Sequence, residues 1–261
     1  MKFKLYVIVI ILFLFYQATQ AQESSRPLLN GNIETDAKLD EINNNASANH
    51  SLQPMPNTLQ AGCIYNENNL PKTNCNDLWF WIPKWRAGEF LRKFQTNFTP
   101  NGPVTFKSEV THFYGFQTDA KNQIWNFVSY PYKETVNIPG LSDIKLVIFF
   151  EPNQISNDYY SIHCITNDIL VDNQTRQITK SYQTEEYQAF KRLNKNIVQA
   201  QCRSQNFDSQ GQPISSFQKY IFTEERIQNY SPSSFWNGIN LRLSFNNYLI
   251  SHNLKDLIPV K

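Results

Sequence analysis

The sequence predicts a mainly β protein whose strands form an antiparallel barrel or, as the alternative, a β-sandwich, with one α-helix packed on the sheet. Three observations predict this class. Apolar and polar residues alternate with period two from Val104 to Phe116, several shorter strand-like stretches follow without helices between them, and one helical pattern begins at Thr184. A chain of 261 residues, 41% of them apolar, is long enough to bury a substantial core.

The clearest element is the strand expected at residues 104–116. The polar segment Thr118–Gln123, with Asp119 and Asn122 as turn formers, leads from it into a second strand at residues 124–130. We therefore predict that these two strands form a β-hairpin. The mainly apolar face of the first strand consists of Val104, Phe106, Ser108, Val110, His112, Tyr114 and Phe116.

The rest of the domain is expected to contain more strands and the helix. The helix is predicted from Thr184 to near Cys202, because Glu185 and Glu186 would occupy its first turn. Its apolar stripe would consist of Tyr187, Phe190, Asn194, Ile197 and Val198. Strands are predicted at residues 145–151, 159–166, 169–172 and 177–183. The tail leaves two alternatives open, a strand at residues 239–245 and a helix at residues 248–258.

The first 21 residues have the pattern of a signal peptide. Lys2 and Lys4 precede an apolar run from Leu5 to Tyr16, and cleavage is expected after Ala21. We therefore expect a secreted or periplasmic protein. Residues 22–60 contain no aromatic side chain and many polar ones, which predicts a disordered leader. A single β-rich domain is then expected at residues 61–261.

The expected mature chain has no net charge. Signal cleavage removes two of the 24 basic residues and no acidic residue, which leaves 22 bases against 22 acids. A neutral chain without a basic block is not expected to bind nucleic acid. The eight glycines are too widely spaced for a glycine-rich nucleotide motif or a GxSxG motif. No cofactor is expected, and no second apolar run is long enough for a transmembrane helix.

Four cysteines lie in the exported part, and an even number in an oxidising compartment predicts disulfide bonds. Three pairings are possible. We favour Cys63 with Cys75 and Cys164 with Cys202, because each pair brackets one expected structural unit. No CxxC motif and no cysteine–histidine spacing typical of zinc sites occurs, so no metal site is predicted.

Four features follow one another in the chain: Gly88-Glu89-Phe90 after Trp85, Asn157-Asp158-Tyr159, Arg176, and the helix expected from Glu185. Their order resembles that of the lipocalins and the wider calycin family. In those proteins a Gly-x-Trp motif opens the first strand, a Thr-Asp-Tyr motif stands near a later turn, an arginine follows, and a helix packs outside the barrel. The resemblance covers about 120 residues of the chain.

The resemblance implies a cup that buries a small apolar ligand. The ligand-facing residues would be Phe106, His112, Tyr114 and Phe116. The base of the barrel would be formed by Trp85, Gly88, Phe90 and Arg176. We therefore expect an exported, non-catalytic binding protein for a small hydrophobic ligand.

Two other classes of function stay open. A secreted or periplasmic enzyme acting on envelope or polymer substrates would use His112 as its acid or base, since imidazole titrates near neutral pH. An adhesion or interaction module would use an aromatic cluster near Trp81, provided that its rings are exposed. This cluster consists of Trp79, Phe80, Trp81, Trp85 and Phe90.

Overall fold

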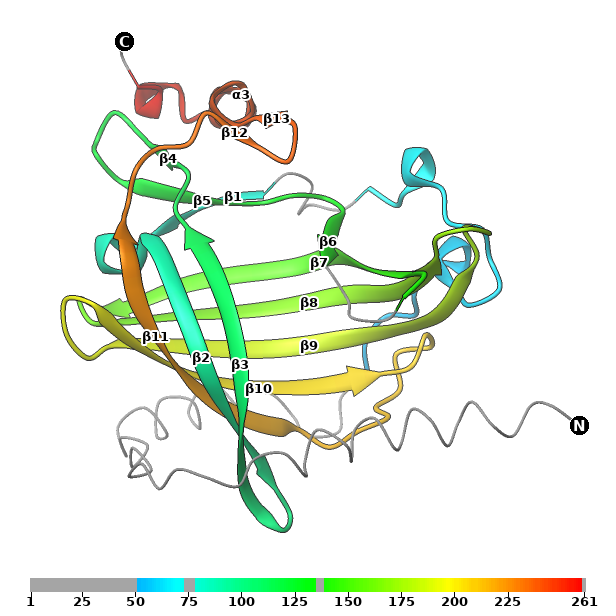
Figure 1. Ribbon diagram of the computed structural model, residues 1–261. Coiled ribbons are helices and arrows are strands. Elements are labelled where there is room, and N and C mark those ends of the chain that lie inside the picture. Colours follow the sequence, from blue (N-terminus) through cyan, green and yellow to red (C-terminus); the bar gives the residue numbers. More distant parts are fainter. Residues whose placement is uncertain (1–50, 73–77, 135–138, 260–261) are drawn as a thin grey trace, which may run out of the picture.

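The computed structural model describes residues 51–72, 78–134 and 139–259, and it confirms a mainly antiparallel β fold (Figure 1). Its largest component is a sheet of eight strands. In their order across the sheet, these are β3 (Gly102–Tyr114), β2 (Gly88–Thr99), β11 (Gln218–Asn229), β10 (Ile197–Phe207), β9 (Ile178–Arg192), β8 (Tyr159–Asp172), β7 (Leu141–Ser156) and β6 (Tyr132–Glu134).

A three-stranded sheet and a helix form two further layers. The small sheet has the order β1 (Leu78–Ile82), β5 (Ile124–Val128) and β4 (Gln117–Thr118). One of its faces shares an apolar core with the large sheet, and the other packs against α3 (Leu241–Ser251) (Figure 1). The remaining elements are the hairpin of β12 (Phe235–Trp236) and β13 (Ile239–Asn240), and the 3-10 helices η1 (Asn57–Leu59), η2 (Glu67–Asn69), η3 (Lys84–Arg86) and η4 (Lys255–Leu257).

The large sheet is open and strongly twisted. Within the described residues, its edge strands β3 and β6 do not pair with each other, so they form no closed barrel. In Figure 1, β7 to β10 run across the view while β11, β2 and β3 cross them steeply. Register shifts at Arg92/Phe94 and Phe222/Glu224 mark β-bulges in these crossing strands, and bulges increase local twist.

The strand predicted at residues 104–116 is present as β3, and its side chains alternate regularly. Odd-numbered residues are exposed, whereas most even-numbered ones are half-buried. Because β3 is an edge strand, Val104 and Val110 on the better-buried face are still 42% and 37% exposed. The strands predicted between residues 145 and 183 are also present, within β7, β8 and the start of β9.

The predicted hairpin between residues 104–116 and 124–130 is wrong. β3 pairs with β2, whereas β5 pairs with β1 and β4 in the small sheet. Gly115 separates the two sheets, because its φ of +84° is accessible mainly to glycine and an added Cβ would lie 2.7 Å from Cγ2 of Ile124. The expected turn after it is confirmed, since Asp119 Oδ1 accepts the backbone N–H groups of Lys121 and Gln123.

The predicted helix from Thr184 to near Cys202 is also wrong. This segment forms most of β9, a turn and the first half of β10. Both strands lie inside the sheet, so side chains on both faces are buried, as with Tyr187 on one face and Phe190 on the other. Burial on both faces produced apolar spacings that resemble a helical stripe. The helix of the described residues is instead α3, where the Asn240 side chain caps the backbone N–H of Leu243.

The predicted disulfide between Cys164 and Cys202 is absent, because both cysteines are free thiols. Cys164 lies on β8 opposite Glu186 of β9, and Cys202 lies on β10 opposite Gln188 of β9. A whole strand therefore separates them. Two strand spacings amount to roughly 10 Å, beyond the Cα separation of about 7 Å that a disulfide can span. Cys63 is a free thiol as well, and its predicted partner Cys75 lies outside the described residues.

The predicted signal peptide, residues 1–21, lies outside the described residues, as does most of the predicted leader. Residues 51–60 of that leader are described, and they pack on the domain instead of preceding it. Met55 and Leu59 are each 2% exposed and contact an apolar cluster on β7, β8 and β9. The described helices include none with the length and apolar character needed to cross a membrane.

Candidate functional site

A buried ionic cluster lies on the inner face of the large sheet, where three separate segments meet. Glu224 comes from β11, His112 and Tyr114 come from β3, and Arg86 comes from η3. The strand pairing places these groups on one face, because His112 is opposite Phe90 of β2 and Glu224 is opposite Arg92 of the same strand. We call Arg86, His112, Tyr114 and Glu224 the Glu224 cluster.

The Glu224 carboxylate accepts hydrogen bonds on both oxygens. Arg86 Nη1 lies 2.6 Å from Oε2, while His112 Nδ1 lies 2.9 Å and the Tyr114 hydroxyl 3.4 Å from Oε1. The guanidinium carbon of Arg86 lies 3.5 Å from the centre of the Tyr114 ring and 4.2 Å from that of Phe190. The charged arginine is therefore enclosed by π-faces and one carboxylate, which suits a desolvated cation.

Burial and charge act on these groups in opposite directions. Glu224 is 0% exposed, and burial alone would raise its pKa, but Arg86 and His112 together lower it to about 2. Burial disfavours the charged form of Arg86, yet the nearby Glu224 carboxylate raises the arginine pKa above its ordinary value. For Tyr114, burial is the main cause of a raised pKa, so the phenol stays protonated. The cluster thus holds one buried ion pair at neutral pH.

Protein stability should fall as the pH drops from about 4.5 towards 2, and Glu224 should account for part of the loss. Its pKa is lowered from 4.5 to about 2 on folding, so its contribution is complete above the unfolded value and disappears as the pH falls through the folded value. Urea unfolding at a series of acidic pH values measures this loss. The Glu224→Gln variant should show a shallower decline, and an equal slope in both proteins would contradict the assignment.

The cluster fixes the orientation of the His112 ring. An ionised carboxylate can only accept hydrogen bonds, so Nδ1 of His112 carries the hydrogen that points at Glu224. In the neutral ring, the lone pair is then on Nε2. The His112 side chain is 33% exposed, in contrast to the fully buried Glu224. This geometry resembles the orienting half of a catalytic triad, with a carboxylate behind an imidazole.

The structure brings together only two of the four predicted ligand-facing residues. His112 and Tyr114 meet at Glu224, whereas Phe106 is half-buried further along β3, opposite Gln95 of β2. Phe116 lies beyond the bend at Gly115, where it packs into the core beneath α3 with its ring centre 5.2 Å from that of Trp236.

The residues expected to form the barrel base also separate. Trp85 and Phe90 are buried in the core between the two sheets, and Gly88 at the start of β2 has a positive φ of 128°. Arg176 lies in the turn between β8 and β9, where it covers the ring of Tyr65 in a different core. Two other arginines pack on Phe90, Arg86 at 5.1 Å and Arg226 at 5.2 Å from the ring centre.

Sequence reasoning missed Arg86 and Glu224, the two charges that define the cluster. The available signal was the position of Arg86 in the run Trp85-Arg86-Ala87, a charge between residues that are buried. Its partner is 138 positions further along the chain, so no local pattern connects them. The aromatic cluster near Trp81 is mostly core: Trp79, Phe80, Trp85 and Phe90 are buried, and Trp81 is half-buried.

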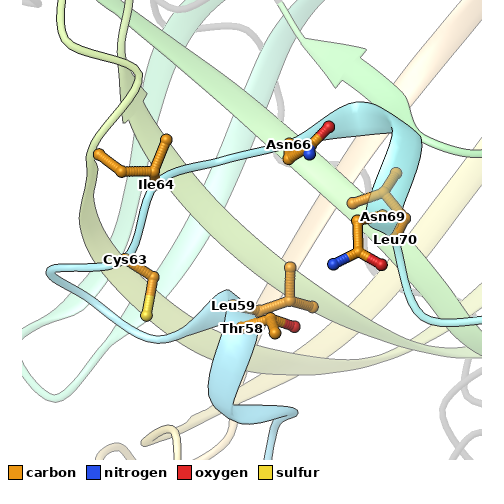
Figure 2. Close-up of a pocket in the computed structure, with 7 residues that line it drawn as sticks. All are labelled: Thr58, Leu59, Cys63, Ile64, Asn66, Asn69 and Leu70. Carbon is orange, nitrogen blue, oxygen red and sulfur yellow. The ribbon is translucent and has the colours of Figure 1, made fainter.

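A separate pocket lies on the N-terminal segment, between η1 and η2 (Figure 2). Its volume is about 370 Å³, and its lining is mainly apolar. The residues that line it are Thr58, Leu59, Cys63, Ile64, Asn66, Asn69 and Leu70. We call this cavity the N-terminal pocket.

The backbone around the N-terminal pocket is held by the large sheet. The N–H of Tyr65 donates to the carbonyl of Arg176, and the N–H of Ile178 donates to the carbonyl of Cys63, each at 2.8 Å. Leu59 is buried in the pocket floor, whereas Ile64 in its wall is 63% exposed. The pocket therefore combines a fixed backbone with an apolar side chain that faces water.

Comparison with known proteins assigns no family to this fold and these two sites. No protein-family model matches the sequence, and neither the curated proteins nor the solved structures give a significant match.

Proposed function

We propose that this is an exported binding protein and that the N-terminal pocket holds a small, mainly apolar ligand. The observation that carries the proposal is the pocket itself. Its volume of about 370 Å³ lies at the lower end of the range of roughly 300–1,000 Å³ that is typical of small-molecule sites. The class of ligand is the one that the resemblance to lipocalins implies, but the site is formed by different residues.

The chemistry of the pocket fits a ligand with an apolar body and one polar group. Leu59, Ile64 and Leu70 supply apolar surface, and the side-chain amides of Asn66 and Asn69 also belong to the lining (Figure 2). A bound ligand would remove the exposed Ile64 side chain from water, which contributes roughly 25 cal/mol per Å² of apolar surface. The side-chain N–H groups of these amides can donate a hydrogen bond to a hydroxyl or carbonyl oxygen, whereas Asn66 Oδ1 already accepts the backbone N–H of Asn68.

The interior between the two sheets is less suited to a ligand, because side chains already fill it. Phe80 and Ile82 of β1 share one apolar core with Phe90, Phe190 and Phe222 of the large sheet, and all five are buried. Well-packed cores contain few voids larger than a water molecule. The N-terminal pocket therefore takes the place of the central cup implied by the lipocalin resemblance.

Ile64→Asp should weaken the binding of an uncharged apolar fluorescent probe such as N-phenyl-1-naphthylamine by about tenfold, because it places a charge in the apolar wall. Titration of probe fluorescence measures the affinity. Leu243→Asp is the matched control, since Leu243 lies on α3 and is 58% exposed, close to the 63% of Ile64. Equal affinities in the two variants, or no binding of any apolar probe, would remove the proposal.

The enzyme alternative has one specific observation in its favour, the orientation of the His112 ring by Glu224. We place it second, because a nucleophilic mechanism also needs a hydroxyl or thiol bonded to the imidazole. Among the described residues, the hydrogen-bond partner of His112 is Glu224, and no serine, threonine or cysteine side chain takes the other position.

A further inference from the structure

Strand β3 has an outer edge that no other described strand covers. It stands at the end of the eight-stranded sheet and pairs with β2 on its inner side (Figure 1). The strand extends over 13 residues, more than twice the mean strand length of about 5–6 residues. A long edge strand offers a row of backbone N–H and C=O groups to a second chain, and many proteins protect such edges by keeping them short.

The sequence of β3 is complementary to its own reverse around Ser108. The register of β3 against β2 shifts between Val110 and Lys107, so Ser108 lies at an irregularity of the strand, but burial still alternates on either side of it. If two copies of the strand run antiparallel with the two Ser108 residues opposite each other, the sequence gives the pairs of facing residues. Going outwards, they are Lys107 with Glu109, Phe106 with Val110, Thr105 with Thr111, and Val104 with His112. These are an opposite-charge pair, two apolar or β-branched pairs of the kind favoured across antiparallel strands, and one mixed pair.

The charged pair provides the selectivity. In one chain, Lys107 Nζ lies 2.9 Å from Glu109 Oε2 on the exposed face, and the two side chains are 71% and 55% exposed. In the antiparallel pairing, each lysine would also face the glutamate of the second copy, which gives four charges of alternating sign. A β-strand of another sequence with like charges at these positions would be repelled.

We propose that the protein forms a two-fold symmetric dimer through β3, with the two strands antiparallel and centred on Ser108. The interface is isologous, because each residue contacts its counterpart in the reversed strand. It extends the open eight-stranded sheet of one copy into that of the second copy. The exposed Val104 and Val110 side chains, on the same face of β3, become partly covered by the facing residues of the partner strand.

Charge-reversal variants test this register. Lys107→Glu puts glutamates at both positions, and Glu109→Lys puts lysines at both. Each variant alone should dimerise about tenfold more weakly than the wild type or worse, because like charges then face each other. An equimolar mixture of the two should form a heterodimer, and the double variant K107E/E109K should dimerise like the wild type. Sedimentation velocity over a micromolar concentration series measures all four.

The control is Lys121→Glu, which makes the same charge change in the β4–β5 turn, seven residues after the end of β3, where Lys121 is 62% exposed. This variant should keep the wild-type dimer. All the substituted side chains are exposed, and circular dichroism of each variant checks that the fold is retained. A wild-type protein that stays monomeric at every concentration, or single variants that dimerise as well as the wild type, would overturn the proposal.

Discussion

Glu224→Ala should lower the free energy of unfolding by about 3–5 kcal/mol. The substitution leaves the Arg86 guanidinium, which is 1% exposed, as an uncompensated buried charge, and removing one partner of a buried ion pair is costly for this reason. It also takes away the acceptor of the His112 and Tyr114 hydrogen bonds. Urea unfolding followed by tryptophan fluorescence at neutral pH measures the change.

The neighbouring residue supplies the control for this prediction. Glu225 forms an ion pair with Lys93 on the opposite face of the sheet, with N and O atoms 3.6 Å apart and both side chains more than half exposed. Glu225→Ala should therefore change stability by about 1 kcal/mol or less. A double variant, Arg86→Met with Glu224→Leu, should be more stable than Glu224→Ala alone, because it buries no unpaired charge. Equal losses in Glu224→Ala and Glu225→Ala would contradict the role given to the cluster.

Phe245→Ala should destabilise the protein by about 3–5 kcal/mol, the usual cost of truncating a buried phenylalanine. Phe245 is 0% exposed and attaches α3 to the small sheet, with its ring centre 4.8 Å from that of Trp79 and 5.6 Å from that of Trp125. Thermal or urea unfolding gives the total loss, and hydrogen exchange should show that the amides of α3 lose most protection.

An exposed leucine on the same helix gives the comparison. Leu243 is 58% exposed, so Leu243→Ala removes little buried surface and should change stability by about 0.5 kcal/mol or less. If Phe245→Ala is as mild as Leu243→Ala, then α3 does not depend on the core beneath it. If hydrogen exchange becomes faster across the large sheet but not in α3, then the loss of stability in Phe245→Ala does not come from the contact between α3 and the small sheet.

The sequence predicted the parts of the fold that depend on local alternation. The period-two pattern from Val104 to Tyr114 specifies β3, because one-sided burial of a strand leaves a record in consecutive residues. The turn at Asp119 was predictable for a similar reason, since its side chain bonds to backbone groups two and four residues ahead. Local signals of this kind need no knowledge of the rest of the chain.

Prediction failed over most of β9 and the first half of β10, although the neighbouring strands β7 and β8 were predicted. In β9, burial alternates from Gln183 to Ala189, but the buried positions include the polar residues Gln183 and Glu185. Hydropathy therefore does not alternate along the strand, and its apolar spacing resembles a helix. The bend at Gly115 was missed too, because a single glycine in the sequence does not indicate which strand will pack against it. Its role follows only from the closeness of Ile124 in the small sheet.

The candidate sites divide in the same way. His112 was identified from sequence as the titratable residue on the better-buried face of β3, and the structure shows it bonded to Glu224. The pairing of Arg86 with Glu224 was not identifiable, because the two residues are 138 positions apart in the chain. The N-terminal pocket was not identifiable either, because part of it lies in a segment expected to be disordered. Which acidic residue pairs with a buried arginine depends on how distant segments pack, and any acidic residue of the chain is a candidate from sequence alone.

By itself, the sequence determined that the protein is built from antiparallel strands, since alternation along a strand reflects the two faces of a sheet. Only the tertiary structure decided which strands pair, that the sheet stays open, and that Arg86 meets Glu224 across 138 positions. The physical reason is that strand pairing and ion-pair burial gain their free energy from contacts between distant segments. Such contacts produce no periodic pattern in the sequence around the residues that make them.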